Sequence, residues 1–172
     1  MPTNIMTNDI TDSIRQHPSV LRVEAALKNA GLSSAVIVMD DATHTAQAAA
    51  DALGCDVAEI AKSIIFRAEN GQAVLVITSG KNRVDEKKIA AIIGQKIGKA
   101  DADFVKEKTG FVIGGVAPIA HLTPSITLLD ADLQAFAYVY PAAGHPHTMF
   151  KMSPAKLVEM TNAQVADVAL VK

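Results

Sequence analysis

The sequence predicts a mixed α/β (α+β) fold, a single domain in which a curved mixed β-sheet is surrounded by helices. The chain has 172 residues, the length of one domain. Hydrophobic residues make up 49% and charged residues 20%, enough apolar material for a core and too little charge for a disordered chain. Strand-like and helix-like segments interleave without strict βαβ alternation, which argues against a doubly wound sheet.

The N-terminal third predicts two helices around one strand. Residues 1–17 are polar and aperiodic until Ile14, so we expect a loose lead-in before a domain spanning residues 18–172. Pro18 and Ser19 begin a helix with an apolar face, which Gly31 ends. The apolar run 35–39 predicts a buried strand. Thr43 or Thr45 caps an alanine-rich helix over residues 46–53, ended by Gly54.

A β-hairpin is the strongest local prediction. Two apolar runs, 60–67 and 73–78, flank Glu69-Asn70-Gly71-Gln72. Asn-Gly favours the tight turn that joins antiparallel strands.

The rest of the chain predicts alternating short elements. Apolar residues at helical spacing from Val84 to Ile97 predict a helix weakened by Gly94 and Gly98. A second helix covers 101–108, and Phe111 then begins a strand that passes into a glycine-proline loop. Strands follow at 126–129 and 135–140, with a turn or short helix at 130–133 between them. A strand at 148–152, a helix from Ser153-Pro154 to about Met160, and a strand at 165–171 complete the chain.

Composition excludes several classes of protein. Sixteen Lys and Arg against eighteen Asp and Glu give a net charge of -2, so a nucleic-acid partner would need a local basic patch. Residues 81–108 are the candidate, with eight basic and five acidic residues and a net +3; a solvated helix face is the alternative. One cysteine, no secretory leader and no membrane-spanning run predict a cytoplasmic protein without membrane contact.

Familiar catalytic motifs are absent, and Gly80-Lys81-Asn82 lacks the rest of a phosphate-binding loop. Cys55 is expected to be a small, mostly buried thiol. His145 and His147 could start a metal site with a third ligand from His44, His121 or an acid. Loop histidines that form hydrogen bonds are the favoured alternative. We therefore expect no metal and no cofactor.

Three segments are candidates for a binding site. Lys62 interrupts an apolar strand, so its ammonium group reaches solvent, meets an acid, or points into a cleft. The Gly114-Gly115-Val116-Ala117-Pro118 loop could present backbone N–H groups to an anion or a carbonyl oxygen, or be a plain tight turn. Gly144-His145-Pro146 could shape a small pocket or simply connect strands.

These three motifs, in this order and spacing, resemble the YbaK / prolyl-tRNA synthetase-associated domain family over about residues 20–168. The resemblance implies a freestanding aminoacyl-tRNA deacylase that removes a small wrong amino acid such as Ala or Cys, typically from tRNA(Pro). It also implies contact with the tRNA 3′ end and with prolyl-tRNA synthetase. A non-catalytic module that binds a nucleotide, a tRNA 3′ end or a synthetase is the alternative.

The resemblance also assigns roles. Lys62 matches the family's key lysine, which contacts the terminal adenosine or phosphate. Gly114, Gly115 and Pro118 match the catalytic G-x-x-x-P loop, whose backbone would stabilise an oxyanion. The implied substrate-binding residues are Ser63, Val116, Ala117, Gly144, His145 and Pro146, although the glycine before His145 is displaced by one from the family pattern. Ala117 and Ile119 are expected to form an apolar wall. The family reaction needs neither a protein nucleophile nor a metal, since a substrate hydroxyl assists water.

Overall fold

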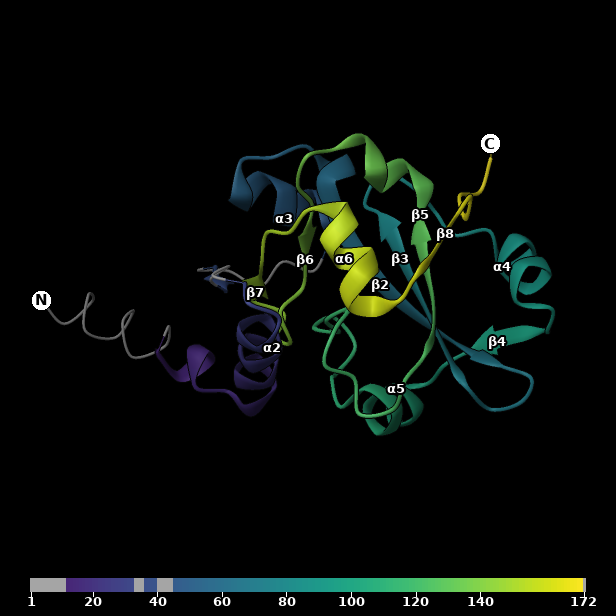
Figure 1. Ribbon diagram of the computed structural model, residues 1–172, viewed down its shortest axis with the longest axis horizontal. Coiled ribbons are helices and arrows are strands. Elements are labelled where there is room, and N and C mark those ends of the chain that lie inside the picture. The colour runs from purple at the N-terminus through teal and green to yellow at the C-terminus, as the bar shows by residue number, and fades with distance from the viewer. Residues whose placement is uncertain (1–11, 33–35, 40–44, 172) are drawn as a thin grey trace, which may run out of the picture.

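A mixed β-sheet forms the centre of the molecule (Figure 1). The computed structural model describes residues 12–32, 36–39 and 45–171. Strands β2 and β3 form the predicted antiparallel hairpin, β5 pairs parallel to β3, and β8 pairs parallel to β5. The sheet contains β4 (Ile97–Lys99), β2 (Ile60–Ala68), β3 (Ala73–Ser79), β5 (Ile126–Asp130) and β8 (Gln164–Ala166) in that order, with β6 (Tyr140–Pro141) beside β2. The mixed sheet predicted from the sequence is confirmed.

The outer edge of β2 is shared by two short neighbours. β6 pairs parallel with Ile60 and Ala61, and β4 pairs antiparallel with residues 66–68. Between them, residues 62–65 have no strand partner on this edge in the described part of the chain. The ladder therefore leaves an opening in the middle of the edge of β2, where backbone polar groups can meet a ligand.

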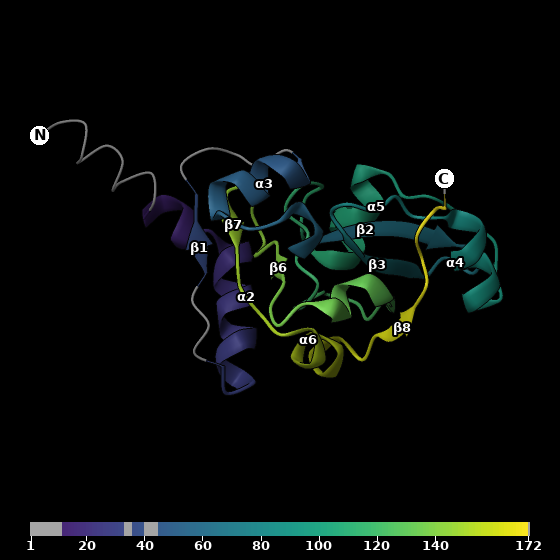
Figure 2. The same cartoon turned by 90° about the horizontal axis from the view of Figure 1, so that it is seen from above.

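Helices cover both faces of this sheet (Figures 1 and 2). α2 (Pro18–Asn29), α5 (Ala102–Thr109) and α6 (Pro154–Thr161) contribute to the main hydrophobic core on one face, whereas α4 (Glu86–Ile93) packs into a second core on the other. A third cluster lies near the start of β2, where α3 (Ala46–Leu53) meets the small sheet of β1 (Ile37–Val38) and β7 (Thr148–Met149). None of the described helices is long and apolar enough to span a bilayer.

Helix ends follow the predicted capping residues. The Thr45 hydroxyl accepts a hydrogen bond from the Ala48 N–H at the start of α3, whereas Thr43 lies outside the described residues. Gly54 ends α3 in the left-handed conformation with a φ of 71°. Of the expected lead-in, residues 12–15 are helical and Arg15 donates to the Val36 carbonyl at 3.1 Å; residues 1–11 lie outside the described part.

The predicted helix reaching Ile97 is wrong. Gly94 adopts a φ of 73° and ends α4, and Ile97 begins β4 against Ala68. The helical spacing of apolar residues extends past Gly94 because α4 and β4 both pack against the second core.

Predictions for four of the short strands also need correction. Phe111 is not in a strand: it is fully buried and leads directly into a turn. The turn or short helix predicted at 130–133 is present as the 3-10 helix η2 (Ala131–Ala135), whereas the predicted strand 135–140 is irregular apart from a bridge at Val139 and the start of β6 at Tyr140. The predicted strand 148–152 shrinks to β7 plus a single bridge at Met152, and the one at 165–171 shrinks to β8 plus a bridge at Ala169. A segment that forms a single bridge can have the same run of apolar residues as a full strand. The sequence alone therefore does not distinguish the two.

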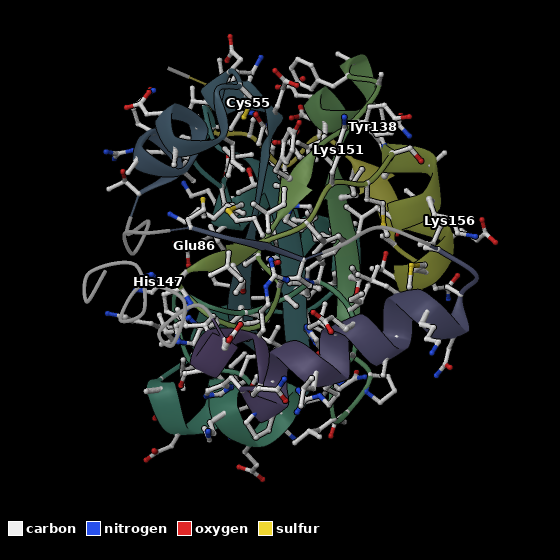
Figure 3. The ribbon with its side chains drawn as sticks, turned by 90° about the vertical axis from the view of Figure 1, so that its left-hand side faces the viewer. Cys55, Glu86, Tyr138, His147, Lys151 and Lys156 are labelled. Atoms are coloured by element: carbon white, nitrogen blue, oxygen red, sulfur yellow. The ribbon has the colours of Figure 1, made fainter. Side chains whose placement is uncertain are left out.

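Irregular segments are nevertheless held by specific contacts. The bridge between Val139 and Met152 brings the preceding Tyr138 beside Lys151, whose ammonium lies 4.4 Å from the ring centroid (Figure 3). This cation–π contact covers an aromatic ring that is half exposed.

A buried carboxylate fixes the end of β3. Asp130 is only 1% exposed and accepts hydrogen bonds from the Thr78 hydroxyl, the Ser79 N–H and the Asn82 amide. The Ser79 hydroxyl in turn donates to the Ala58 carbonyl at 2.7 Å. A buried charge requires donors like those of Asp130, and they tie the end of β3 to the end of β5. The Ser79 hydroxyl ties the same end to the η1 turn (Val57–Glu59), which joins α3 to β2.

Candidate functional site

A cavity of about 420 Å³ opens at the unpaired edge of β2. This volume is within the range of about 300–1,000 Å³ that is usual for small-molecule sites. The edge itself contributes residues 60–65, and α3 contributes Thr45, Ala46 and Ala49. The remaining walls come from Ala100, Val105, Ile113, Gly114, Val116, Ala142, Pro146, Thr148 and Met149. The cavity thus gathers residues from all three candidate motifs.

Lys62 lies on β2 at the wall of this cavity. It is an exposed residue opposite Thr78 on β3, and its ammonium forms no ion pair with any carboxylate in the described ranges. A lysine without such a partner can offer its charge to an anionic ligand. The structure therefore places Lys62 in a cleft, one of the alternatives left open by the sequence.

Ser63 carries the only buried side-chain polar atom that lacks a hydrogen-bond partner in the described part of the chain. It lies next to Lys62 and also lines the cavity. An unsatisfied buried hydroxyl costs about 1–3 kcal/mol. A ligand group that bonds the Ser63 hydroxyl would remove this cost.

The glycine loop begins with a type II turn. The Gly115 N–H donates to the Val112 carbonyl at 3.0 Å, and Gly114 takes the position that requires a positive φ, here 97°. The N–H of Gly115 is thus used by the turn. Gly114 and Val116 line the cavity, and their N–H groups donate to no acceptor among the residues that the structure describes. These two groups can donate to a ligand.

The two glycine motifs pack directly against each other. A Cβ on Gly115 would lie 2.9 Å from the His145 Cα, and one on Gly144 would lie 2.7 Å from the Ser19 carbonyl oxygen. Only glycine allows this approach. The loop 114–118 is therefore supported by the loop 144–146, which rests on the first turn of α2.

The other residues of these motifs lie behind the cavity wall. Ala117 is fully buried, Ile119 is 5% exposed, and Pro118 is buried; none of the three lines the cavity. The apolar wall expected from Ala117 and Ile119 is instead formed by Val105, Val116 and Met149. Of the second motif only Pro146 lines the cavity, whereas Gly144 and His145 do not.

His145 turns toward other histidines. Its ring centroid lies 5.4 Å from that of His17 and 5.4 Å from that of His147, and its Nδ1 accepts the His147 N–H at 3.0 Å. Burial, together with the charges of His147 and His17, lowers the pKa of His145. His147, labelled in Figure 3, bonds the Met39 carbonyl oxygen through its Nδ1. These histidines hold the loop to β1 and α2.

The proposed metal ligands do not assemble in the part of the chain that is described. No group of three or more His, Cys, Asp or Glu residues in this part could hold a metal ion. His121 bonds the Ala117 carbonyl instead, and His44 lies outside the described residues.

Cys55 is partly buried and is absent from the cavity wall. Burial and then the charges of Glu59 and Asp56 raise the pKa of its thiol. A raised pKa disfavours the nucleophilic thiolate, so the thiol has no catalytic environment.

Sequence reasoning missed Arg22, which holds both ends of the glycine loop. It donates from Nε to the Ala120 carbonyl at 2.9 Å and from Nη2 to the Thr109 carbonyl at 2.8 Å. Its guanidinium also stacks 4.4 Å from the Phe111 ring centroid. The available signal was weak: an arginine next to the apolar positions of an amphipathic helix. Arg22 fixes the loop from behind rather than from within the cavity.

His121 supports the loop from its other side. Its Nε2–H donates to the Ala117 carbonyl at 2.6 Å, and its Nδ1 lies 3.3 Å from the Ser125 hydroxyl. Burial, with a smaller contribution from the charge of Arg22, lowers the pKa of His121 below its ordinary value of 6.5. The folded chain therefore prefers the neutral imidazole.

This preference predicts acid sensitivity. Because the folded pKa is lowered, the unfolded chain takes up the proton first, so this contribution to stability is complete above about pH 6.5 and is lost as the pH falls toward the folded value. Urea unfolding at pH 7.5 and 5.5 should show a smaller loss of unfolding free energy in His121→Gln than in wild type. An equal loss in both proteins would show that His121 does not contribute.

Comparison with known proteins supports an editing domain. The sequence model of the aminoacyl-tRNA editing domain family matches residues 40–160. A solved structure described as a candidate trans-editing enzyme for prolyl-tRNA synthetase superposes with a TM-score of 0.85 and 41% identity, covering 90% of this chain and 98% of that one.

Two curated bacterial proteins are similar in sequence. The uncharacterized protein YwhH of Bacillus subtilis is 32% identical over 130 residues, covering 76% of this chain and 83% of YwhH. EbsC of Enterococcus faecalis, named as a candidate Cys-tRNA(Pro)/Cys-tRNA(Cys) deacylase, is 25% identical over 127 residues, covering 72% of this chain and 76% of EbsC. With the family match over most of its length, this chain belongs to the aminoacyl-tRNA editing domain family.

Proposed function

We propose that this protein is a trans-editing aminoacyl-tRNA deacylase, which hydrolyses the ester of tRNA(Pro) carrying a small wrong amino acid such as alanine or cysteine. The observation that carries the proposal is the cavity at the open edge of β2. It brings the free ammonium of Lys62, the unpartnered hydroxyl of Ser63 and the N–H groups of Gly114 and Val116 to one place. Membership of the family supplies the reaction class.

The reaction needs a bound ester, a polarised carbonyl and a water molecule. Lys62 would bind the terminal adenosine or its phosphate at the cavity mouth and hold the ester in place. The N–H groups of Gly114 and Val116 would donate to the carbonyl oxygen as it gains negative charge in the tetrahedral intermediate. Water adds its oxygen to the acyl carbon, and the bond from that carbon to the ribose oxygen breaks.

Proton transfer completes the reaction. The ribose oxygen gains a proton and leaves as the free hydroxyl of tRNA, while the amino acid leaves as the free acid. A neighbouring substrate hydroxyl can assist the water, so no protein nucleophile is required. Gly115 and Pro118 would act by setting the shape of the loop. Gly144 and His145 would act by packing against the loop on the side away from the cavity.

The amino-acid pocket would be small and mostly apolar. Val105, Val116 and Met149 supply apolar surface, and Ser63 supplies one hydroxyl. Such walls separate side chains by about 1–3 kcal/mol per methylene, enough for preference among small residues. The names of EbsC and of the structural neighbour, which refer to Cys-tRNA and to prolyl-tRNA synthetase, support this substrate class.

This proposal also implies where and with whom the protein acts. The substrate would be the aminoacylated 3′ end of tRNA, and prolyl-tRNA synthetase, which charges that tRNA, would be a partner. Both occur in the cytoplasm, where translation takes place.

A panel of charged tRNAs tests the proposal. Purified protein would be incubated with Ala-, Cys-, Ser-, Thr- and Pro-tRNA(Pro), and the remaining ester measured over time. We expect rapid loss of one or two of the wrong amino acids and no loss of proline. Hydrolysis of Pro-tRNA(Pro) as fast as the others would contradict an editing role, and no hydrolysis of any of them would contradict the proposed substrate.

A further inference from the structure

Two cations share one aromatic ring beside the cavity. The Arg67 guanidinium lies 5.1 Å from the centroid of the Phe104 ring, and the Lys108 ammonium lies 5.8 Å from it. Arg67 is exposed, whereas Phe104 is only 7% exposed. We call Arg67, Phe104 and Lys108 the Phe104 cation cluster. The ring attracts both positive charges, of which Arg67 is exposed and Lys108 half-buried.

No carboxylate neutralises these charges in the described residues. Neither Arg67 nor Lys108 forms an ion pair there, whereas Lys81 pairs with Asp132 at 3.9 Å and Lys88 with Asp167 at 2.8 Å. The basic segment 81–108 is therefore not one uniform face. Lys81 and Lys88 have acidic partners, whereas the other basic residues of the segment form no ion pair among the described residues. Of these, Lys108 shares the Phe104 ring with Arg67, which comes from β2.

The cluster is continuous with the cavity. Ile65 lies two residues before Arg67 on the same face of β2, and Val105 follows Phe104 on α5; both line the cavity. Lys99, exposed at the end of β4, precedes Ala100, another lining residue. At the strand rise of about 3.3 Å per residue, Arg67 lies roughly 17 Å along β2 from Lys62. The open edge of β2 ends at Ile65, because β4 pairs with residues 66–68. A chain that leaves the cavity past Ile65 and Val105 would therefore meet the cluster on the side of the sheet where α5 packs.

We propose that the Phe104 cation cluster binds the phosphodiester backbone of the tRNA acceptor strand as it leaves the cavity. This inference rests on the proposed function, and it adds a second anion site at a distance from Lys62. Arginine matches phosphate geometry with two parallel hydrogen bonds, and lysine adds a point charge. A protein with a net charge of -2 has to bind a nucleic acid through such a local patch. Contacts of this kind hold the strand without reading its sequence.

Direct binding of uncharged RNA tests the proposal without requiring turnover. A fluorescent acceptor-stem RNA ending in CCA would be titrated with wild type and with Arg67→Gln/Lys108→Gln, and the Kd measured by anisotropy at several salt concentrations. We expect the Kd to rise about 10-fold. The slope of log Kd against log salt should fall by about 1.4, which is two single-strand phosphate contacts.

Two further variants control for charge and for folding. Lys28→Gln removes one exposed charge at the end of α2, which points away from α5 in Figure 2, and should leave the Kd and the slope unchanged. Arg67→Lys/Lys108→Arg keeps both charges and should retain binding. Melting curves identify any variant that fails to fold.

The outcomes separate this inference from the proposed function. An unchanged Kd and salt slope in the folded Gln double variant would overturn the inference, as would an equal effect of Lys28→Gln. Normal RNA binding by wild type without hydrolysis of any charged tRNA would overturn the proposed deacylase activity and leave the cluster as an RNA site. In the deacylation assay, loss of the cluster should raise the KM for charged tRNA.

Discussion

Replacing Lys62 by alanine is expected to lower the rate of ester hydrolysis at least about 100-fold, the usual cost of losing one group that binds and orients a reacting substrate. The fold should survive the substitution. Lys62 is exposed, and its side chain forms no ion pair in the described part of the protein. Single-turnover hydrolysis of Ala-tRNA(Pro) measures the rate, and thermal melting measures the stability.

Matched lysine variants sharpen this prediction. Lys62→Arg keeps the charge but changes its geometry, so it should retain part of the activity. Lys87→Ala removes an exposed lysine from α4, which packs on the other face of the sheet, and should hydrolyse the ester at the wild-type rate. A folded Lys62→Ala protein with undiminished hydrolysis would remove Lys62 from the mechanism.

Gly115→Ala is expected to reduce activity by about 100-fold although Gly115 itself does not line the cavity. The new methyl group would lie 2.9 Å from the Cα of His145 and 3.0 Å from its backbone N and C. Backbone atoms cannot rotate away, so the glycine turn and the His145 loop must separate. A displacement of about 1 Å at Gly114 and Val116 is enough for this loss of rate. Overpacking of this kind also lowers the unfolding free energy by about 1–3 kcal/mol.

Gly98→Ala provides the control for Gly115→Ala. A Cβ on Gly98 meets nothing within 4 Å, and its backbone lies outside the left-handed region. It should therefore retain activity and stability, measured by urea unfolding and by the same single-turnover assay. If Gly115→Ala matched Gly98→Ala in both assays, close packing of the two loops would not be what positions the glycine turn.

Local signals in the sequence predicted the elements that depend on a few neighbouring residues. Asn70 and Gly71 form the turn between β2 and β3, with the Asn70 side chain accepting the Gln72 N–H. Thr45 and Gly54 bound α3 as expected. Capping and turn chemistry act within about four residues, so they are visible in the sequence alone.

Tertiary pairing decided what the sequence could not predict. The gap in the edge of β2 exists because β6, about eighty residues later, covers Ile60 and Ala61, and no local pattern encodes that contact. The direction of the His145 side chain depends on His17 at the start of α2. Arg22 holds carbonyl groups about ninety and one hundred residues away. All three motifs contribute residues to the cavity wall, but which of their residues line it and which lie behind it depended on the fold.

The lifetime of the ester tests the central claim most directly. A non-catalytic module that bound the same tRNA end would shield the ester from water, whereas a deacylase shortens its life. The measurement is the half-life of Ala-tRNA(Pro) with the protein in excess over the tRNA, beside a sample without protein. We expect a much shorter half-life with wild type, and a half-life close to the protein-free value with Lys62→Ala. A half-life unchanged by wild type would contradict hydrolysis, and a lengthened half-life would in addition identify the protein as a module that binds and shields the ester.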